Sequence, residues 1–307
     1  MLPRQSAILR AARGIRWPCY TLCSKPMTRQ KLGQHFLSDP GWREKIARAV
    51  GVSPHGRQPG IAGQPFCWIE VGAGHGEMTE HLARSGAPVI AVELDKSLLS
   101  GLRRVGERYP NLTVVHADIL ETDLAALAAG RRIRVYGNLP YYITSPILHH
   151  FFQYAQQIDE AHLVVQLEVA ARLTAHPGRK QYGYLSVATQ FYSRPQFVLR
   201  LPPNAFRPPP EVASALVTIR FPGEAGTQPH SDTVKFLDFV KTCFAQKRKT
   251  LTNNLRQLAS GEQVRAILDQ LNLRKDARAE QLSVREFMVL FQLISSEPSV
   301  AGPDSRS

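Results

Sequence analysis

One short stretch of the sequence, VYGNLPYYI at residues 135–143, combines groups that could act on an aromatic amine. Asn138 offers an amide oxygen, Pro140 restricts the residue before it to an extended conformation, and Tyr141 offers a flat ring. The same residues could form only a tight turn after a strand, because Asn and Pro are ordinary turn formers. The chemistry of this stretch therefore depends on which groups the fold places beside it.

Further polar groups follow three other predicted strands. Gly72 and Gly74 lie in EVGAGHGEMTEHL, where a glycine turn between strand and helix lets a ligand approach backbone amides. Glu77 occupies the position of the third glycine of a dinucleotide fingerprint, and its carboxylate would repel a pyrophosphate. Glu93 ends the next strand and Asp118 ends the third, where carboxylates could accept hydrogen bonds from ribose hydroxyls and an exocyclic amine. The pattern favours a nucleoside ligand without phosphates.

This set of residues predicts binding of S-adenosylmethionine. Residues 70–124 contain nine acidic and five basic side chains, an excess that suits a positive sulfonium. Asn138 would end the fourth strand beside the methyl donor. Its side-chain oxygen and the Leu139 carbonyl could accept both hydrogens of an adenine N6 amine, and Tyr141 could stack on the extruded base. These contacts would free the nitrogen lone pair for attack on the methyl group. No strong general base is needed, because the N6 amine becomes very acidic once it is methylated.

The order of the predicted elements supplies a scaffold for these groups. Short apolar strands alternate with amphipathic helices, which predicts an α/β, Rossmann-like domain with a mostly parallel sheet. A linker-like composition at residues 222–232 is followed by four helical segments, the last beginning with a capping-box pattern of Ser283 and Glu286. We expect four regions. Residues 1–26 form an Arg-rich, disordered or targeting-like tail, and residues 27–221 form a donor-binding domain. Residues 233–296 form a small helical domain, and residues 297–307 form a flexible tail.

The net charge of +13 is concentrated in stretches that contain no acidic residue. Three such stretches are residues 1–38, 169–210 and 239–256, with seven, six and five Lys or Arg. A single basic run is often only a solvated helix face, but three in one chain favour a polyanionic partner. The last stretch predicts that Lys247, Arg248 and Lys249 contact RNA phosphates.

Composition limits the location of the protein and its cofactors. No apolar run approaches the roughly 18 residues that span a membrane, so no membrane partner is expected. Four cysteines without a CxxC pair favour a reducing compartment. No metal site is expected, and His149 and His150 should lie on a helix surface. We expect a bacterial cytoplasmic protein, although the Arg-rich N-terminus leaves mitochondrial import open.

Seven segments in this order resemble the rRNA adenine N6-dimethyltransferase family, specifically its bacterial small-subunit (16S) branch. The resemblance covers residues 27–296 and rests on QKLGQHFLSDP, EVGAGHGEMTEHL, VELD, HADIL, GNLPYYITSPIL, FRPPPEVASALV and FAQKRKTLTNNL. It implies dimethylation of N6 on two adjacent adenosines in a hairpin loop near the 3′ end of 16S rRNA. It further implies a monomer whose helical domain docks on the small ribosomal subunit and a role in subunit biogenesis.

The resemblance also assigns roles to residues. The positions that bind the donor in this family fall on His35, Leu37, Gly72, Glu93, Asp118 and Asn138. The positions that contact the target base fall on Asn138, Leu139, Tyr141 and Phe206, with Phe206 expected on the far face of the base. Two positions depart from the family pattern: His35 replaces a more usual Asn, and Tyr142 replaces a smaller polar residue and is expected to pack.

Three other classes of function remain open on the sequence. A 23S rRNA methylase of the erythromycin-resistance type shares NLPY and the glycine turn, although FAQKRKTLTNNL argues against it. A ribosome-assembly or mitochondrial transcription factor B-like binding protein would not need Glu93, Asp118 and Asn138 together. A DNA adenine methylase usually has Pro-Pro-Tyr after its Asp or Asn, where this chain has Leu139 in place of the first Pro.

Overall fold

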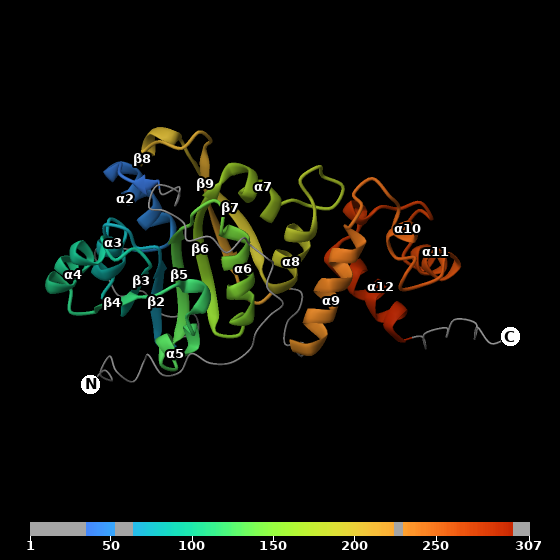
Figure 1. Ribbon diagram of the computed structural model, residues 1–307, viewed down its shortest axis with the longest axis horizontal. Helices are drawn as coiled ribbons and strands as arrows, with labels where there is room; N and C mark the ends of the chain where they lie inside the picture. Colours follow the sequence, from blue (N-terminus) through green and yellow to red (C-terminus); the bar gives the residue numbers. More distant parts are fainter. Residues whose placement is uncertain (1–34, 53–63, 224–229, 297–307) are drawn as a thin grey trace. The chain divides into compact units, whose positions relative to one another are not determined.

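The computed structural model describes residues 35–52, 64–223 and 230–296, which form two compact units (Figure 1). The first unit contains the described residues up to Ala170 together with Ser193–Pro222, and the second contains the rest. Both predicted tails and residues 224–229 of the predicted linker lie outside the described part. Within the described residues, no helix is both long enough and apolar enough to cross a membrane.

A seven-stranded sheet with the order β4-β3-β2-β5-β6-β9-β7 forms the centre of the first unit. The strands β4, β3, β2, β5 and β6 are parallel to one another, and β9 runs antiparallel between β6 and β7. The central strands are fully buried and rich in Val and Ile, as expected for a sheet covered on both faces. The strands are β2 (Phe66–Val71), β3 (Val89–Glu93), β4 (Leu112–His116), β5 (Arg132–Asn138), β6 (Ile158–Gln166), β7 (Arg194–Leu201) and β9 (Ser214–Arg220).

Helices cover the sheet and complete its core. Asp39 caps the first described helix, with Pro40 in its first turn; the Asp39 side chain accepts from the Trp42 amide at 2.9 Å. Buried side chains of α2 and α3 pack in one cluster with Phe66 and Trp68 of β2, while α5 and α6 lie in front of the sheet in Figure 1. The helices of this unit include α2 (Pro40–Ala49), α3 (Thr79–Arg84), α4 (Leu99–Arg108), α5 (Leu124–Ala128) and α6 (Thr144–Gln153).

The strand order reverses between β2 and β5. From β2 the chain builds outward through β3 to β4, and it then returns to add β5 on the other side of β2. Loops that follow β2 and β5 therefore diverge and leave a crevice at the carboxyl ends of the strands, where open α/β sheets bind ligands. A separate two-stranded pairing of β1 (Phe36–Leu37) with β8 (Phe206–Arg207) also belongs to this unit.

The second unit is helical. The ring centroids of Phe191 in α8 and Phe236 in α9 lie 4.5 Å apart, so α8 packs within this unit. The predicted boundary at residue 221 grouped α8 with the strands. The predicted capping box is confirmed: the Ser283 amide donates to the Glu286 carboxylate at 2.6 Å, and the Glu286 amide donates to Ser283 Oγ at 3.3 Å. The helices are α8 (Tyr184–Tyr192), α9 (His230–Cys243), α10 (Leu251–Asn254), α11 (Gly261–Gln270) and α12 (Val284–Ser296).

Candidate active site

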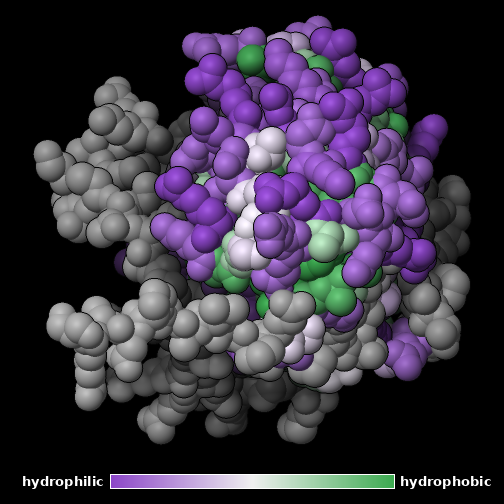
Figure 2. All heavy atoms as spheres, turned by 90° about the vertical axis from the view of Figure 1, so that its right-hand side faces the viewer, coloured by the Kyte–Doolittle hydropathy of each residue, from purple (hydrophilic) through white to green (hydrophobic). Residues whose placement is uncertain are grey.

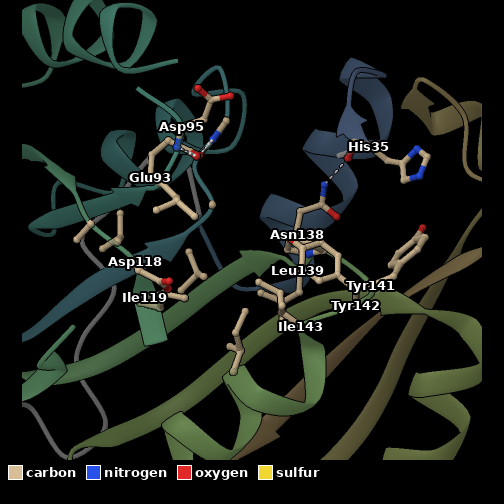
Figure 3. Close-up of a pocket in the computed structure, with 18 of the residues that line it drawn as sticks. His35, Glu93, Asp95, Asp118, Ile119, Asn138, Leu139, Tyr141, Tyr142 and Ile143 are labelled. Carbon is tan, nitrogen blue, oxygen red and sulfur yellow. Dashed lines mark hydrogen bonds between the residues drawn. The ribbon is translucent and has the colours of Figure 1, made fainter. Parts of the chain in front are cut away.

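A cavity of about 510 Å³ lies at the carboxyl ends of β2, β3 and β5, a size typical of small-molecule sites. Its two ends differ in chemistry (Figure 3): Glu93, Asp95 and Asp118 lie at one end, and Asn138, Tyr141 and His35 lie at the other. Residues more than one hundred positions apart in the sequence are thus brought to one cavity. The acidic end suits a cationic or hydroxyl-rich ligand, and the other end suits a flat polar ring.

The glycine turn after β2 forms one wall of the acidic end. Gly72 and Gly74 have φ values of +67° and +61°, a region that side chains with a Cβ rarely adopt. A Cβ on Gly72 would meet no atom within 4 Å, whereas one on Gly74 would lie 3.2 Å from the Phe36 ring. The turn therefore exposes its backbone to the cavity at Gly72 and packs against Phe36 at Gly74.

The Glu93 carboxylate, at the acidic end of the cavity, is held by two backbone amides. Its Oε2 accepts from the Gly74 amide at 2.8 Å and its Oε1 from the Asp95 amide at 2.9 Å, and only 4% of the residue is exposed. Because an ionised carboxylate has about four acceptor positions, two remain for hydroxyl groups in the cavity. The two amides hold the carboxylate in place before any ligand binds.

Asp118 both caps a short helix and lines the cavity. Its Oδ1 accepts from the Leu120 amide at 2.9 Å and caps the short helix η3 (Ile119–Glu121). The residue also lines the cavity, with Ile119 beside it (Figure 3). The cap orients the carboxyl group through Oδ1, and Oδ2 takes no part in it.

Asn138 ends β5 at the opposite end of the cavity. Its Nδ2 donates to the His35 carbonyl at 2.8 Å, and this donation determines which end of the amide is nitrogen. The Asn138 Oδ1 is therefore the atom left to accept a hydrogen from a ligand amine. The bond links β5 to the segment before β1, 103 positions earlier in the chain.

The residues after Asn138 are held by their neighbours in the sheet. The Leu139 amide donates to the Val164 carbonyl at 3.0 Å, and its side chain is buried. A Cβ on Gly137 would lie 2.8 Å from Leu139 Cδ2, so only a glycine lets Leu139 pack where it does. A glycine inside a predicted strand, as at Gly137, is the sequence signal that indicates such a close approach.

Tyr141 presents its ring between His35 and Ser214. The Tyr141 hydroxyl and Ser214 Oγ lie 2.9 Å apart, and burial raises the pKa of the Tyr141 phenol. The ring stacks on the His35 imidazole with centroids 5.6 Å apart at an interplanar angle of 29°. His35 is anchored in turn by a 2.7 Å hydrogen bond between its Nδ1 and the Pro208 carbonyl. His35 thus contributes both its carbonyl and its ring to this end of the cavity.

Two of the residues assigned by resemblance lie outside the cavity. Leu37 and Phe206 face each other in the β1·β8 pairing and belong to the hydrophobic core, where they are 4% and 2% exposed. Phe206 does not line the cavity in this structure, and its contact with a target base stays a prediction. The remaining predicted residues of the first unit line the cavity, whereas Lys247, Arg248 and Lys249 lie in the second unit.

Sequence reasoning missed or misread three side chains. Phe36 lines the cavity and covers Gly74, although only its neighbours His35 and Leu37 were assigned. Tyr142 was expected to pack, but it is 50% exposed and lines the cavity. His150 was expected on a helix surface, but it is buried, and its Nε2 lies 3.0 Å from the Thr122 carbonyl.

A row of buried polar side chains crosses the sheet next to the cavity. Glu70, Tyr136, His162 and Thr218 lie opposite one another on β2, β5, β6 and β9. Burial raises the pKa of Glu70 to about 8 and lowers the pKa of His162. Both shifts favour the uncharged forms at neutral pH, as expected for groups removed from water.

Replacement of Glu70 by Gln should make stability less dependent on pH. Between about pH 5 and pH 8 the unfolded chain loses the Glu70 proton while the folded chain retains it. Wild-type stability should therefore fall as pH rises through this window, by at most about 1.4 kcal/mol per pH unit. Glu70→Gln removes this contribution. Urea titrations at pH 5.5, 6.5 and 7.5 measure the slope, with the exposed Glu107→Gln as control, and equal slopes for wild type and Glu70→Gln would contradict the assignment.

The strand order, the antiparallel β9 and a nucleoside-type cavity at the reversal point define a Rossmann-like methyltransferase domain. A family model described as ribosomal RNA adenine dimethylase matches residues 26–296. The chain therefore belongs to the ribosomal RNA adenine dimethylase family, whose members are enzymes that use a methyl donor. The predicted family, fold class and enzyme class are confirmed.

Individual relatives agree with this family. Ribosomal RNA small subunit methyltransferase A of Xanthomonas euvesicatoria pv. vesicatoria (strain 85-10) is 40% identical over 262 residues, 85% of this chain and 94% of that protein. The crystal structure of the 23S rRNA methyltransferase ErmE has a TM-score of 0.65 and 26% identity, covering 85% of this chain and 100% of its own. A dimethyladenosine transferase from Plasmodium falciparum has a similar fold, with a TM-score of 0.68, 23% identity and coverage of 83% and 96%.

Proposed function

We propose that this protein uses S-adenosylmethionine to dimethylate N6 of two adjacent adenosines in a hairpin loop near the 3′ end of 16S rRNA. The proposal includes the small ribosomal subunit as the substrate particle and subunit biogenesis as the process. One observation carries it: the Asn138 amide nitrogen donates to the His35 carbonyl, so that its acceptor oxygen is left available beside the Tyr141 ring in the cavity that also contains Glu93 and Asp118. The small-subunit relative at 40% identity supports the choice of rRNA.

The acidic end of the cavity fits the methyl donor. Glu93 would accept from the two ribose hydroxyls with the acceptor positions that its backbone bonds leave open. Asp118 would accept from the adenine amine of the donor, and the backbone at Gly72 leaves room for close approach. When bound, S-adenosylmethionine supplies an electrophilic methyl group on a positive sulfonium, which the surrounding carboxylates favour.

The opposite end of the cavity would hold the target adenine. Asn138 Oδ1 and the Leu139 carbonyl would accept the two N6 hydrogens, which makes the nitrogen pyramidal and frees its lone pair. Tyr141 would support the base through its ring, and displacement or rotation of the His35 ring would open that face. Positioning and hydrogen bonding then supply most of the rate, since the alkylated amine is acidic enough to lose its proton without a strong base.

Partner and location follow from the same proposal. Lys247, Arg248 and Lys249 are exposed and would contact rRNA phosphates, while the protein acts as a monomer in the bacterial cytoplasm. The bacterial relatives support this location over a mitochondrial one. A second candidate is methylation of 23S rRNA, which the fold of ErmE favours; the lower identity of ErmE, 26% against 40%, makes it the weaker candidate.

A direct assay separates the two substrates. Full-length protein and labelled S-adenosylmethionine are incubated with small subunits, with large subunits, and with naked 16S rRNA, all from cells that lack the corresponding methylations. We expect label in small subunits, recovered by mass spectrometry as N6,N6-dimethyladenosine at two adjacent positions near the 3′ end. Label in large subunits alone would establish the 23S alternative, and no label in any substrate would contradict the proposed function.

A further inference from the structure

The imidazole of His35 covers one face of the Tyr141 ring. The two ring centroids are 5.6 Å apart and the interplanar angle is 29°, so the rings are stacked. Figure 3 shows them one above the other at the end of the cavity that contains Asn138. Glu93 and Asp118 lie at the opposite end. The His35 ring therefore lies where the base is proposed to bind and not where the donor is proposed to bind.

The two rings are held differently. The Tyr141 hydroxyl is 2.9 Å from Oγ of the fully buried Ser214, which fixes that ring from the interior. The His35 carbonyl accepts from the Asn138 amide at 2.8 Å, and its Nδ1 donates to the Pro208 carbonyl at 2.7 Å, since a carbonyl can only accept. Pro208 is exposed, so the His35 ring has room to shift while its backbone stays bonded to Asn138.

The spacing of the two rings is close to the spacing that one inserted base requires. Stacked bases lie about 3.4 Å apart, so a base between two parallel rings needs about 6.8 Å. From a centroid distance of 5.6 Å, the rings have to separate by only about 1–2 Å to admit it. Because Asn138 is bonded to the backbone of His35, its acceptor oxygen stays beside this slot when the ring shifts.

The resemblance to the family places another aromatic side chain, Phe206, on the far face of the base. In this structure Phe206 is 2% exposed, packs in the hydrophobic core and does not line the cavity. Its backbone pairs with Leu37 of β1, which holds it in that position. His35 already lines the cavity and already stacks on Tyr141. His35 is therefore better placed than Phe206 to cover the far face of a base.

We propose that the target adenine inserts between the rings of Tyr141 and His35, so that the His35 imidazole is the second stacking platform of the methyl-acceptor site. This inference rests on the proposed function, because it takes the ligand at this end of the cavity to be the base that is methylated. Until the base enters, the two rings shield each other's faces from water. Stacking tolerates any base, so the rings would hold the extruded base while Asn138 and Leu139 select its amine.

The test compares three substitutions that separate the ring of His35 from its polar character. His35→Ala removes both, His35→Asn keeps a polar group, and His35→Phe keeps a ring. All three keep the backbone carbonyl that accepts from Asn138. Single-turnover methylation by the full chain is measured on unmethylated small and large ribosomal subunits at saturating S-adenosylmethionine. Calorimetric titration measures donor affinity, and thermal unfolding checks that each variant is folded.

His35→Ala and His35→Asn should slow methyl transfer by roughly 5- to 150-fold, the effect expected for loss of one base–aromatic stack. His35→Phe should recover most of the lost rate, and donor affinity should stay at the wild-type value in all three. The control, His176→Ala, removes an exposed imidazole that does not line the cavity. It lies in the second unit, whose face in Figure 2 is mostly hydrophilic, and it should keep the wild-type rate.

Three results would overturn the proposal. A faster rate in His35→Asn than in His35→Phe, with donor affinity weakened in His35→Phe, would assign the side chain to the donor. Equal losses in all three variants would assign the effect to the hydrogen bond with Pro208 and not to the ring. A wild-type rate in His35→Ala would exclude the ring altogether, and a loss in Phe206→Leu would then place Phe206 on the base.

The choice of subunits separates this inference from the proposed function. If wild-type protein labels small subunits and His35→Ala does so at the same rate, only the inference about His35 fails. If wild-type protein labels large subunits alone and His35→Ala is slow on them, only the proposed rRNA target fails. Absence of label in both particles would contradict both proposals.

Discussion

Replacement of Asn138 by Ala should reduce methyl transfer by a hundredfold or more while most RNA affinity remains. The Asn138 oxygen is proposed to accept a hydrogen from N6 as that nitrogen becomes tetrahedral, so its contribution is larger in the transition state than in the bound substrate. Loss of one oriented acceptor of this kind costs on the order of 3–4 kcal/mol of barrier. RNA affinity is proposed to depend chiefly on basic surfaces that the substitution does not alter.

Asn138→Asp is the sharper variant, because Asp keeps an acceptor oxygen but cannot donate to the His35 carbonyl, 2.8 Å from the present amide nitrogen. Repulsion between the carboxylate and that carbonyl should turn the side chain away, so activity should fall toward that of Asn138→Ala. Tyr141→Phe is the control, since it keeps the ring and loses only the hydroxyl bond to Ser214, worth about 0.5–1.5 kcal/mol. Single-turnover rates on bound subunits at saturating donor measure all three, and a near-normal rate for Asn138→Ala would refute the assignment.

Replacement of Glu93 by Ala should weaken binding of the methyl donor by roughly a hundredfold. Each charge-assisted hydrogen bond to a ribose hydroxyl is worth about 1.5–3 kcal/mol. The same substitution removes the acceptors of the Gly74 and Asp95 amides, which loosens the glycine turn as well. Glu93→Gln should be nearly as damaging, because its NH₂ group would face one of those two amides donor to donor.

Calorimetric titration with S-adenosylmethionine tests this expectation. Asp118→Ala should lose less affinity than Glu93→Ala, since Asp118 is proposed to contact one amine and its other oxygen caps η3. The exposed Glu107→Gln should bind like the wild type and controls for the change in net charge. Wild-type affinity in Glu93→Gln would show that the carboxylate does not bind the ribose, whatever the result for Glu93→Ala.

Several parts of the site could be predicted because they depend on local pattern. Strand-ending residues such as Gly72, Glu93 and Asn138 can be read from apolar runs and their boundaries, and parallel strands bring their carboxyl ends to one edge. The Asp39 cap and the capping box at Ser283 were predictable for the same reason, since each involves residues within one turn. Patterns within a short stretch of sequence were sufficient at all of these positions.

The features that could not be predicted depend on contacts between distant segments. The pairing of Leu37 with Phe206 joins two two-residue strands, and neither is long enough to show a periodic pattern. β7 carries polar and exposed residues, so it lacks the apolar run that identified the other strands. Tyr142 follows a turn whose geometry decides whether the ring packs or faces the cavity, and neither its type nor its spacing contains that information.

The link between Asn138 and His35 has a consequence for the time at which the enzyme becomes active during its own synthesis. A nascent chain that has just completed β6 already contains the glycine turn, both carboxylates and Asn138. It still lacks β8, the partner of β1, and the Pro208 carbonyl that anchors the His35 ring. The segment that orients the Asn138 amide therefore gains its support only after residue 208 has left the ribosome. A chain whose translation stops before that point carries the residues proposed to bind the donor without the support that aligns the acceptor amide.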